Sequence, residues 1–106
     1  MTLPEKLKIG GHWVKVIYPH HFKERYDRCG QYDDTLKEIR ISDVDCAGNK
    51  AADSAIFVSF IHEVLHAVDI ISGHAVFSKN EPAIEGISEG IFQVLVDNKF
   101  LDLKKK

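Results

Sequence analysis

With 106 residues, the chain is long enough for one domain with a single core and too short for two, so we expect residues 1–106 to form one domain. Its hydrophobic fraction of 44% and charged fraction of 28% are typical of a soluble globular protein. The net charge of -2 argues against the broad basic surface that nucleic-acid binding requires, and no apolar run approaches the roughly 20 residues of a membrane span.

The start of the chain, Met1–Lys8, lacks the apolar stretch of a secretory signal, which predicts a cytoplasmic protein. Two cysteines are present, Cys29 and Cys46, and they do not form a C-x-x-C pair. We therefore expect neither a disulfide framework nor a cysteine zinc site, and we interpret both cysteines as reduced.

A first β-hairpin is predicted near the start of the chain. Apolar and polar residues alternate over residues 7–9 and 12–18, on either side of the Gly10-Gly11 pair, which is typical of a tight two-residue turn. The following segment, residues 20–28, mixes charged and aromatic residues and fits either a short helix or a loop.

A second hairpin is predicted from two short strands around a polar turn. The strands are expected over residues 30–32 and 38–41, and Asp33 and Asp34 between them are turn-forming residues. Residues 42–50 are rich in Asp, Gly and Asn, which predicts a loop.

From Asp53 the spacing of apolar residues changes to that of a helix, with Asp53 or Ser54 as the N-cap and Gly73 as the stop. At about 100° per residue its apolar side chains fill one wide arc, so we expect the helix to be buried. The arc consists of Phe57, Phe60, Ile61, Val64, Leu65, Val68 and Ile71. The opposite edge carries a narrow polar stripe, with Glu63 beside it, that consists of Ser59, His62, His66 and Asp69.

A second helix is predicted from about Glu81 or Pro82 to Asn98, because apolar residues recur at helical spacing after a proline in the first turn. Glu85 and Glu89 lie one turn apart and share a face of this helix. Together the elements predict an α+β fold, in which a small antiparallel sheet of three or four strands packs on two helices.

The first helix contains the motif H-E-x-x-H, formed by His62, Glu63 and His66. On a helix the two histidines lie one turn apart and point the same way, as two ligands of one metal ion must. Two imidazoles suit zinc, and Glu63 projects beside them, where a carboxylate can reach a water on the metal without being a ligand. These polar residues would be costly to bury in an apolar helix unless something satisfied them, which favours a metal site over two merely hydrogen-bonded histidines.

The second helix, in the stretch Ile84-Glu85-Gly86-Ile87-Ser88-Glu89, resembles the glutamate-bearing helix of thermolysin-like gluzincins. In that family the pattern is N-E-x-x-S-D, whose Glu is the third metal ligand and whose Asp holds the first histidine by a hydrogen bond. The resemblance implies that Glu85 is the third zinc ligand and that Glu89 is the carboxylate that holds His62. Ile84 and Glu89 depart from the Asn and Asp of the family.

The stretch from His62 to Val68, H-E-V-L-H-A-V, also closely matches these enzymes, and the resemblance covers about Phe60–Asp97. In plan the compact chain is similar to minimal zincins encoded by phages and prophages, and to ImmA/IrrE-type and SprT-like metallopeptidase domains. The resemblance implies a zinc-dependent metallopeptidase that hydrolyses a peptide or protein substrate with Glu63 as general base. An edge strand, for which we take residues 38–41, is expected to pair with the substrate backbone.

Two other functions remain open from the sequence. The first is a catalytically silent, zincin-like module that holds metal and grips a protein partner, and the second is a metal-free helical interaction protein. The presence of Glu63 favours the enzyme, because a purely structural zinc has no use for a general base.

Two further sets of residues have more than one possible role. Asp69 lies on the stripe of His62, where it either hydrogen-bonds a ligand imidazole or is an exposed carboxylate at the helix end. Three tyrosines, Tyr18, Tyr26 and Tyr32, are alternative donors to an oxyanion, and the sequence does not choose among them.

Overall fold

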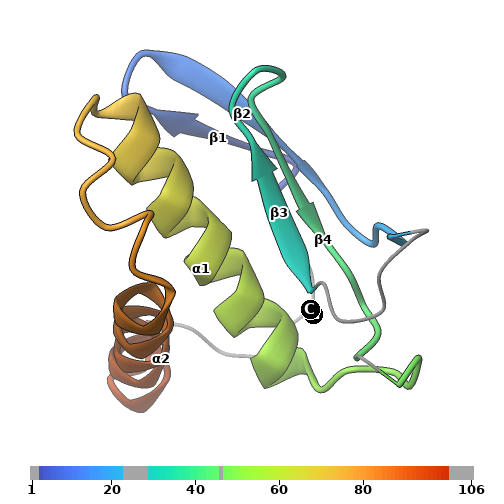
Figure 1. Ribbon diagram of the computed structural model, residues 1–106. Helices are drawn as coiled ribbons and strands as arrows, with labels where there is room; N and C mark the ends of the chain where they lie inside the picture. Colours follow the sequence, from blue (N-terminus) through green and yellow to red (C-terminus); the bar gives the residue numbers. More distant parts are fainter. Residues whose placement is uncertain (1–2, 23–28, 46, 101–106) are drawn as a thin grey trace.

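Four strands precede two helices in the computed structural model, which describes residues 3–22, 29–45 and 47–100. The elements are β1 (Lys6–Ile9), β2 (His12–Ile17), β3 (Gly30–Asp33), β4 (Glu38–Ile41), α1 (Asp53–Ile71) and α2 (Glu81–Asp97). The strands form one sheet, α1 lies across one face of it, and α2 packs on α1 (Figure 1). This arrangement confirms the predicted α+β class with a small sheet and two helices.

The first hairpin is confirmed, with β1 and β2 antiparallel and Ile9 opposite His12. Gly10 in its turn has a φ of 58°, a backbone conformation that residues with a side chain rarely adopt. A Cβ at this position would also lie 3.0 Å from the Cγ2 atom of Ile71. Glycine therefore serves both the turn and the close approach of the hairpin to the end of α1.

The second hairpin is also confirmed, with Gly30 of β3 opposite Ile41 of β4. The sheet as a whole is mixed, because β2 and β4 run parallel, with Val16 opposite Ile39, in the order β1-β2-β4-β3. The predicted antiparallel pairing thus holds within each hairpin and not between them. β3 lies at the edge of the sheet away from β1, and β4 then runs back between β3 and β2. The strand that we expected at an edge, residues 38–41, is consequently interior, and β3 is the edge strand on that side of the sheet.

The loop predicted over residues 42–50 is present between β4 and α1, with one isolated bridge between Val44 and Lys50. Most of the segment predicted as either a short helix or a loop, residues 20–28, lies outside the described residues, because residues 23–28, with Tyr26, are not described. Cys46 lies outside them as well.

The core lies between α1 and the sheet face that it covers. Its buried members are Ile9, Val14, Val16, Ile39, Ile41, Ile56, Phe60 and Ala67. On the opposite face Trp13 is 55% exposed, and the ammonium groups of Lys6 and Lys8 lie 4.5 and 5.1 Å from the centre of its ring. That face is therefore open to solvent, and the apolar packing is one-sided.

Helix α1 begins at Asp53 and ends at Ile71, shortly before the predicted stop at Gly73. Its N-cap is Ala52, with no side-chain hydrogen bond, so the prediction of Asp53 or Ser54 as the cap is wrong. Asp53 instead lies in the first turn, where its negative charge interacts favourably with the helix dipole. Phe60 and Ile61 are buried as predicted, whereas Val68 from the same arc is 41% exposed.

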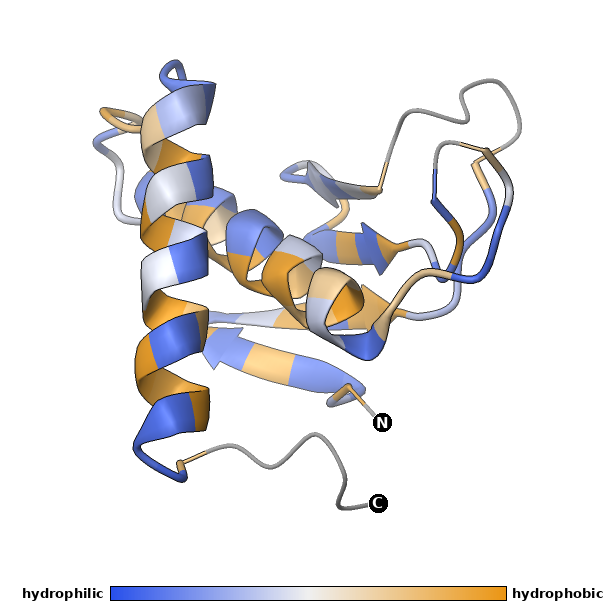
Figure 2. Ribbon diagram, turned by 90° about the horizontal axis from the view of Figure 1, so that it is seen from below, coloured by the Kyte–Doolittle hydropathy of each residue, from blue (hydrophilic) through white to orange (hydrophobic). Residues whose placement is uncertain are grey.

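Helix α2 has the predicted extent, and its N-cap is Asn80, whose side chain accepts a hydrogen bond of 3.1 Å from the amide of Ala83. Its buried residues Ile84 and Ser88 lie on one face, and the rings of Phe57 and Phe92 lie 6.1 Å apart between the two helices. Figure 2 shows α2 crossing α1 at a steep angle, with apolar and polar bands along its length. Only part of α2 therefore lies against α1.

By length and composition alone, α1 meets the criterion for a membrane-spanning helix. This is weak evidence, because the core helix of a soluble protein meets the same criterion. Here α1 contacts β1, β3, β4 and α2, so its surroundings are protein on several sides. The architecture is consistent with a soluble globular domain.

We predict that Ile39→Ala lowers the free energy of unfolding by about 2–5 kcal/mol, because it leaves a cavity at the centre of the sheet. Ile39 is fully buried in β4, the strand that joins the two hairpins. The matched control is Leu36→Ala in the β3–β4 turn, where the side chain is 59% exposed and the expected change is below about 0.5 kcal/mol. Chemical denaturation measures both. Equal midpoints for the two variants would contradict this account of the core.

Candidate metal centre

The two histidines of the H-E-x-x-H motif lie on successive turns of α1. The centroids of the His62 and His66 rings are 4.9 Å apart, and their side chains are 17% and 15% exposed. The spacing of one helical turn therefore brings the imidazoles side by side, as predicted, with limited access to solvent.

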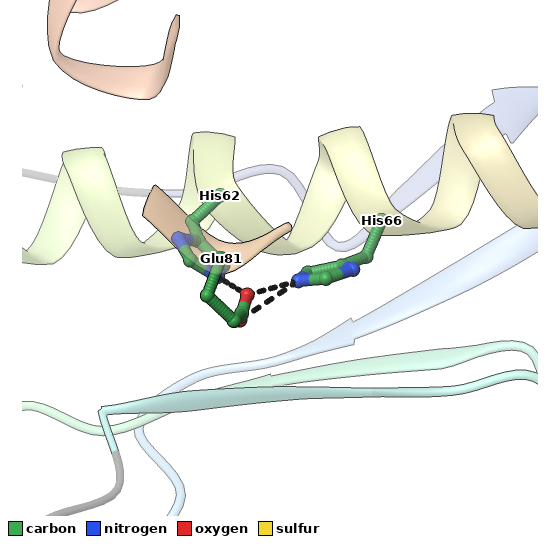
Figure 3. Close-up of side chains that lie close together, drawn as sticks. All are labelled: His62, His66 and Glu81. Carbon is green, nitrogen blue, oxygen red and sulfur yellow. Dashed lines mark hydrogen bonds and ion pairs between the residues drawn. The ribbon is translucent and has the colours of Figure 1, made fainter. Parts of the chain in front are cut away.

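Glu81, the first residue of α2, completes a cluster with these histidines. Its Oε1 atom lies 3.1 Å from Nε2 of His62 and 2.9 Å from Nε2 of His66. In Figure 3 the carboxylate lies between the two rings and meets both. Ligand atoms from the three residues lie within 4.8 Å of one another, and within residues 3–22, 29–45 and 47–100 this is the one such group.

Two separations in this cluster are compatible with a bound metal ion such as zinc. Donors placed about 2.0–2.1 Å from a tetrahedral ion are about 3.3 Å from one another. The two separations of 3.1 and 2.9 Å between Glu81 and the imidazoles are close to that value. Two imidazoles and one carboxylate are also a donor set of catalytic zinc sites, in which the fourth position is left for water or substrate.

The charge of Glu81 suits a metal ligand. Partial burial raises the pKa of its carboxyl, but the hydrogen bond with His66 and the interaction with His62 lower it by more, so the pKa lies below its ordinary value. Its position in the first turn of α2 also places the carboxylate at the positive end of the helix dipole. Glu81 is therefore ionised at neutral pH, which is the form that binds a cation.

The third member of the cluster differs from our prediction of Glu85. Glu81, Glu85 and Glu89 follow one another at four-residue spacing, and all three line the same cleft. α2 crosses α1 steeply (Figure 2) and rises about 6 Å per four residues, and the Glu81 carboxylate of its first turn is the one hydrogen-bonded to the two histidines. The predicted helix face is therefore the one that meets the site, and the structure brings Glu81 rather than Glu85 to the imidazoles. Both Glu85 and Glu89 are exposed.

Glu63 is not a member of the cluster, which is compatible with the role predicted for it. Its residue is 9% exposed, and it lines the cleft together with His62. A Cβ at Gly30 would lie 3.0 Å from Cγ and 3.2 Å from Oε2 of Glu63. The glycine thus allows the backbone of β3 to approach the glutamate, which is packed between α1 and the edge strand.

Asp69 takes neither of the two roles that we considered for it. The residue is 8% exposed, so it is not a solvated carboxylate at the helix end. Oδ1 accepts a 3.0 Å hydrogen bond from the amide of Val76, and Oδ2 accepts from the amides of Phe77 and Ser78 at 3.0 and 2.9 Å. The Ser78 hydroxyl donates to Oδ2 as well, at 2.8 Å. Both oxygens therefore face the loop between α1 and α2 rather than an imidazole.

Of the tyrosines considered as oxyanion donors, Tyr32 lines the side of the site next to His66. Its hydroxyl donates a 2.8 Å hydrogen bond to Asp34, and burial together with that bond raises its pKa above the ordinary value. Tyr18 packs against the hydrophobic core. The choice of a donor stays a prediction; of the two tyrosines that the structure describes, Tyr18 and Tyr32, Tyr32 lines the site.

An open cleft of about 840 Å³ lies between α1, α2 and the start of β3. Its lining includes Cys29 and the carboxylate side chains of Glu63, Glu81, Glu85 and Glu89. A smaller hollow of about 340 Å³ continues along β3 past Gly30, Gln31 and Tyr32. The cluster of His62, His66 and Glu81 thus lies where the cleft meets the edge strand β3.

Comparison of the chain with family models, with curated proteins and with solved structures finds no match. The chemistry of its side chains and the H-E-x-x-H pattern are therefore the basis for a proposed function of the site.

We predict that Glu81→Ala weakens zinc binding by more than about 100-fold, beyond the 10- to 100-fold typical of residues that only support a ligand. The matched controls are Glu85→Ala and Glu89→Ala, which remove carboxylates from the same exposed helix face. These variants should bind zinc nearly as tightly as the wild type. Competition with a chromophoric chelator measures all four affinities. A larger loss for Glu85→Ala than for Glu81→Ala would restore the ligand set implied by the gluzincin resemblance.

Proposed function

We propose that the chain is a zinc-dependent metallopeptidase that hydrolyses peptide bonds in a peptide or protein substrate. The observation that carries the proposal is the convergence of His62, His66 and Glu81, with the carboxylate of Glu63 buried beside them and outside the ligand cluster. Structural zinc sites are closed by four protein ligands, whereas three ligands leave a position open for chemistry.

Zinc held by these three residues would lower the pKa of a bound water to about 7 and polarise the carbonyl of the scissile bond. Glu63 accepts the proton of the attacking water and then delivers it to the leaving amine. General acid–base catalysis of this kind contributes typically about 10²- to 10⁴-fold in rate. Its packing against Gly30 restricts the Glu63 side chain to the side of the site that faces β3.

The edge strand β3 is suited to bind an extended substrate. One side of β3 pairs with β4, and Gly30, Gln31 and Tyr32 line the hollow beside His66 on the other side. A peptide that added to this edge through main-chain hydrogen bonds would pass directly in front of Glu63. β3 replaces residues 38–41 in this role, because β4 lies inside the sheet.

The resemblance to gluzincins supports the same activity. It rests on the H-E-x-x-H-A-V stretch from His62 to Val68 and on the glutamate-bearing face of α2. The departure from that family is the carboxylate next to the imidazoles, which is Glu81 rather than Glu85. We also propose a cytoplasmic location and a kinship in plan with the small zincins of phages and prophages.

We predict that Glu63→Gln lowers the rate of peptide hydrolysis by about 10²- to 10⁴-fold while zinc content and melting temperature stay near those of the wild type. The amide keeps the shape of the side chain and cannot take a proton. Hydrolysis of a broad peptide library, zinc content by elemental analysis and thermal unfolding are measured on both proteins. His62→Ala is the control, since it should lose both zinc and hydrolysis.

Hydrolysis that survives in Glu63→Gln would contradict the role of Glu63. A wild type that binds zinc but cleaves no peptide, together with a Gln variant that still performs the biological task, would favour the alternative of a catalytically silent module that grips a protein partner. A wild type that binds no zinc would favour the metal-free interaction protein.

A further inference from the structure

Beyond the C-cap of α1, residues 74–78 of the loop between α1 and α2 are all hydrogen-bonded to one residue of α1, Asp69. The main-chain oxygen of Asp69 accepts hydrogen bonds from the amides of His74 and Ala75, at 3.3 and 3.1 Å. Its carboxylate then accepts those of the next three residues, 76–78, at 2.9 to 3.0 Å. Five consecutive amides of the loop are thus directed at one aspartate.

Apolar packing does not hold this loop in place. Val76 and Phe77, its large hydrophobic residues, are 65% and 51% exposed. The buried carboxylate of Asp69 is therefore the principal contact that determines the path of the loop. Burial raises the pKa of this carboxyl, but the hydrogen bonds from the hydroxyl and amide of Ser78 and from the other amides lower it by more. Asp69 is consequently ionised at neutral pH and accepts all of these bonds.

The path of the loop determines where Glu81 lies. The amide of Asn80 donates to the carbonyl of Phe77 at 2.9 Å, and the amide of Ile84 donates to the carbonyl of Asn80 at 3.1 Å. A continuous series of hydrogen bonds thus connects Asp69 to the first turn of α2. Glu81 lies within that turn, and its side chain is itself 55% exposed, so the backbone rather than packing around the carboxylate determines its position.

We infer that Asp69 is a positioning residue for metal binding, which acts by presenting Glu81 to His62 and His66. The inference rests on the proposed zinc function. Asp69 follows His66 by one turn of α1 and Glu81 follows the loop, so the same helix supplies two imidazoles and the anchor of the third donor. Ordering the third donor before the metal arrives removes an entropic cost of binding.

The test is a double-mutant cycle of zinc affinity, measured by chelator competition on wild type, Asp69→Asn, Glu81→Ala and the double variant. Asparagine keeps the size of the side chain, but its NH₂ group is a donor and cannot accept hydrogen bonds from the N–H groups of the loop. Asp69→Asn should lower the affinity by roughly 10- to 100-fold. In the Glu81→Ala background it should change the affinity little, because the residue that it positions is gone. Asp97→Asn, at the far end of α2 where Asp97 accepts from Gln93, should match the wild type.

An unchanged affinity in folded Asp69→Asn, or an equal loss with and without Glu81, would overturn the inference, since a purely structural role gives additive losses. Circular dichroism checks folding. If Asp69→Asn does not fold, Ser78→Ala replaces it, because that change removes one donor to Oδ2 and leaves the carboxylate in place. It should give a smaller loss that also vanishes without Glu81. If the wild type binds no zinc, the proposed function itself is contradicted. If the wild type binds zinc and Asp69→Asn binds it equally tightly, only this inference is contradicted.

Discussion

The contact between the Glu81 carboxylate and the imidazoles of His62 and His66 is the constraint on which the site depends. The two imidazoles share a helix, so the local spacing of α1 brings them together without help from the rest of the chain. The third side chain, Glu81, comes from α2. Its position therefore depends on the loop before α2, on the N-cap of α2 and on the packing of α2 on α1. Their combined effect is to bring one carboxylate oxygen within 3.1 Å of both rings.

The two carboxylates of the site, Glu81 and Glu63, have different neighbours around α1. On the side of α2 lies Glu81, and on the side of the sheet lies Glu63, packed against the start of β3 at Gly30. In the proposed mechanism Glu81 comes from α2 and Glu63 is packed against β3, where an extended substrate would bind beside both. The proposal gives the two carboxylates different roles because Glu81, and not Glu63, belongs to the cluster with the imidazoles.

Local patterns predicted both hairpins, both helices and the face of α1 that carries His62 and His66, because strand and helix periods are properties of short segments. The parallel pairing of β2 with β4 was missed, since it joins segments that are distant in the sequence. Glu81 could not be distinguished from Glu85 because both lie on the same face of α2, and only the crossing with α1 selects between them. The sequence did place Glu81 in the first turn of the predicted helix, directly before Pro82, where the helix follows the loop from α1. The bonds of Asp69 go largely to backbone amides, which leave no trace in the sequence.

The most direct measurement of the central claim is anomalous diffraction at the zinc edge, from crystals grown with one equivalent of zinc. We predict one zinc per chain, about 2.0–2.2 Å from Nε2 of His62, Nε2 of His66 and a carboxylate oxygen of Glu81. The Glu63 carboxylate should lie nearby and outside the coordination sphere. Zinc bound through Cys29 or through Glu85 and Glu89, or no ordered zinc at all, would contradict it.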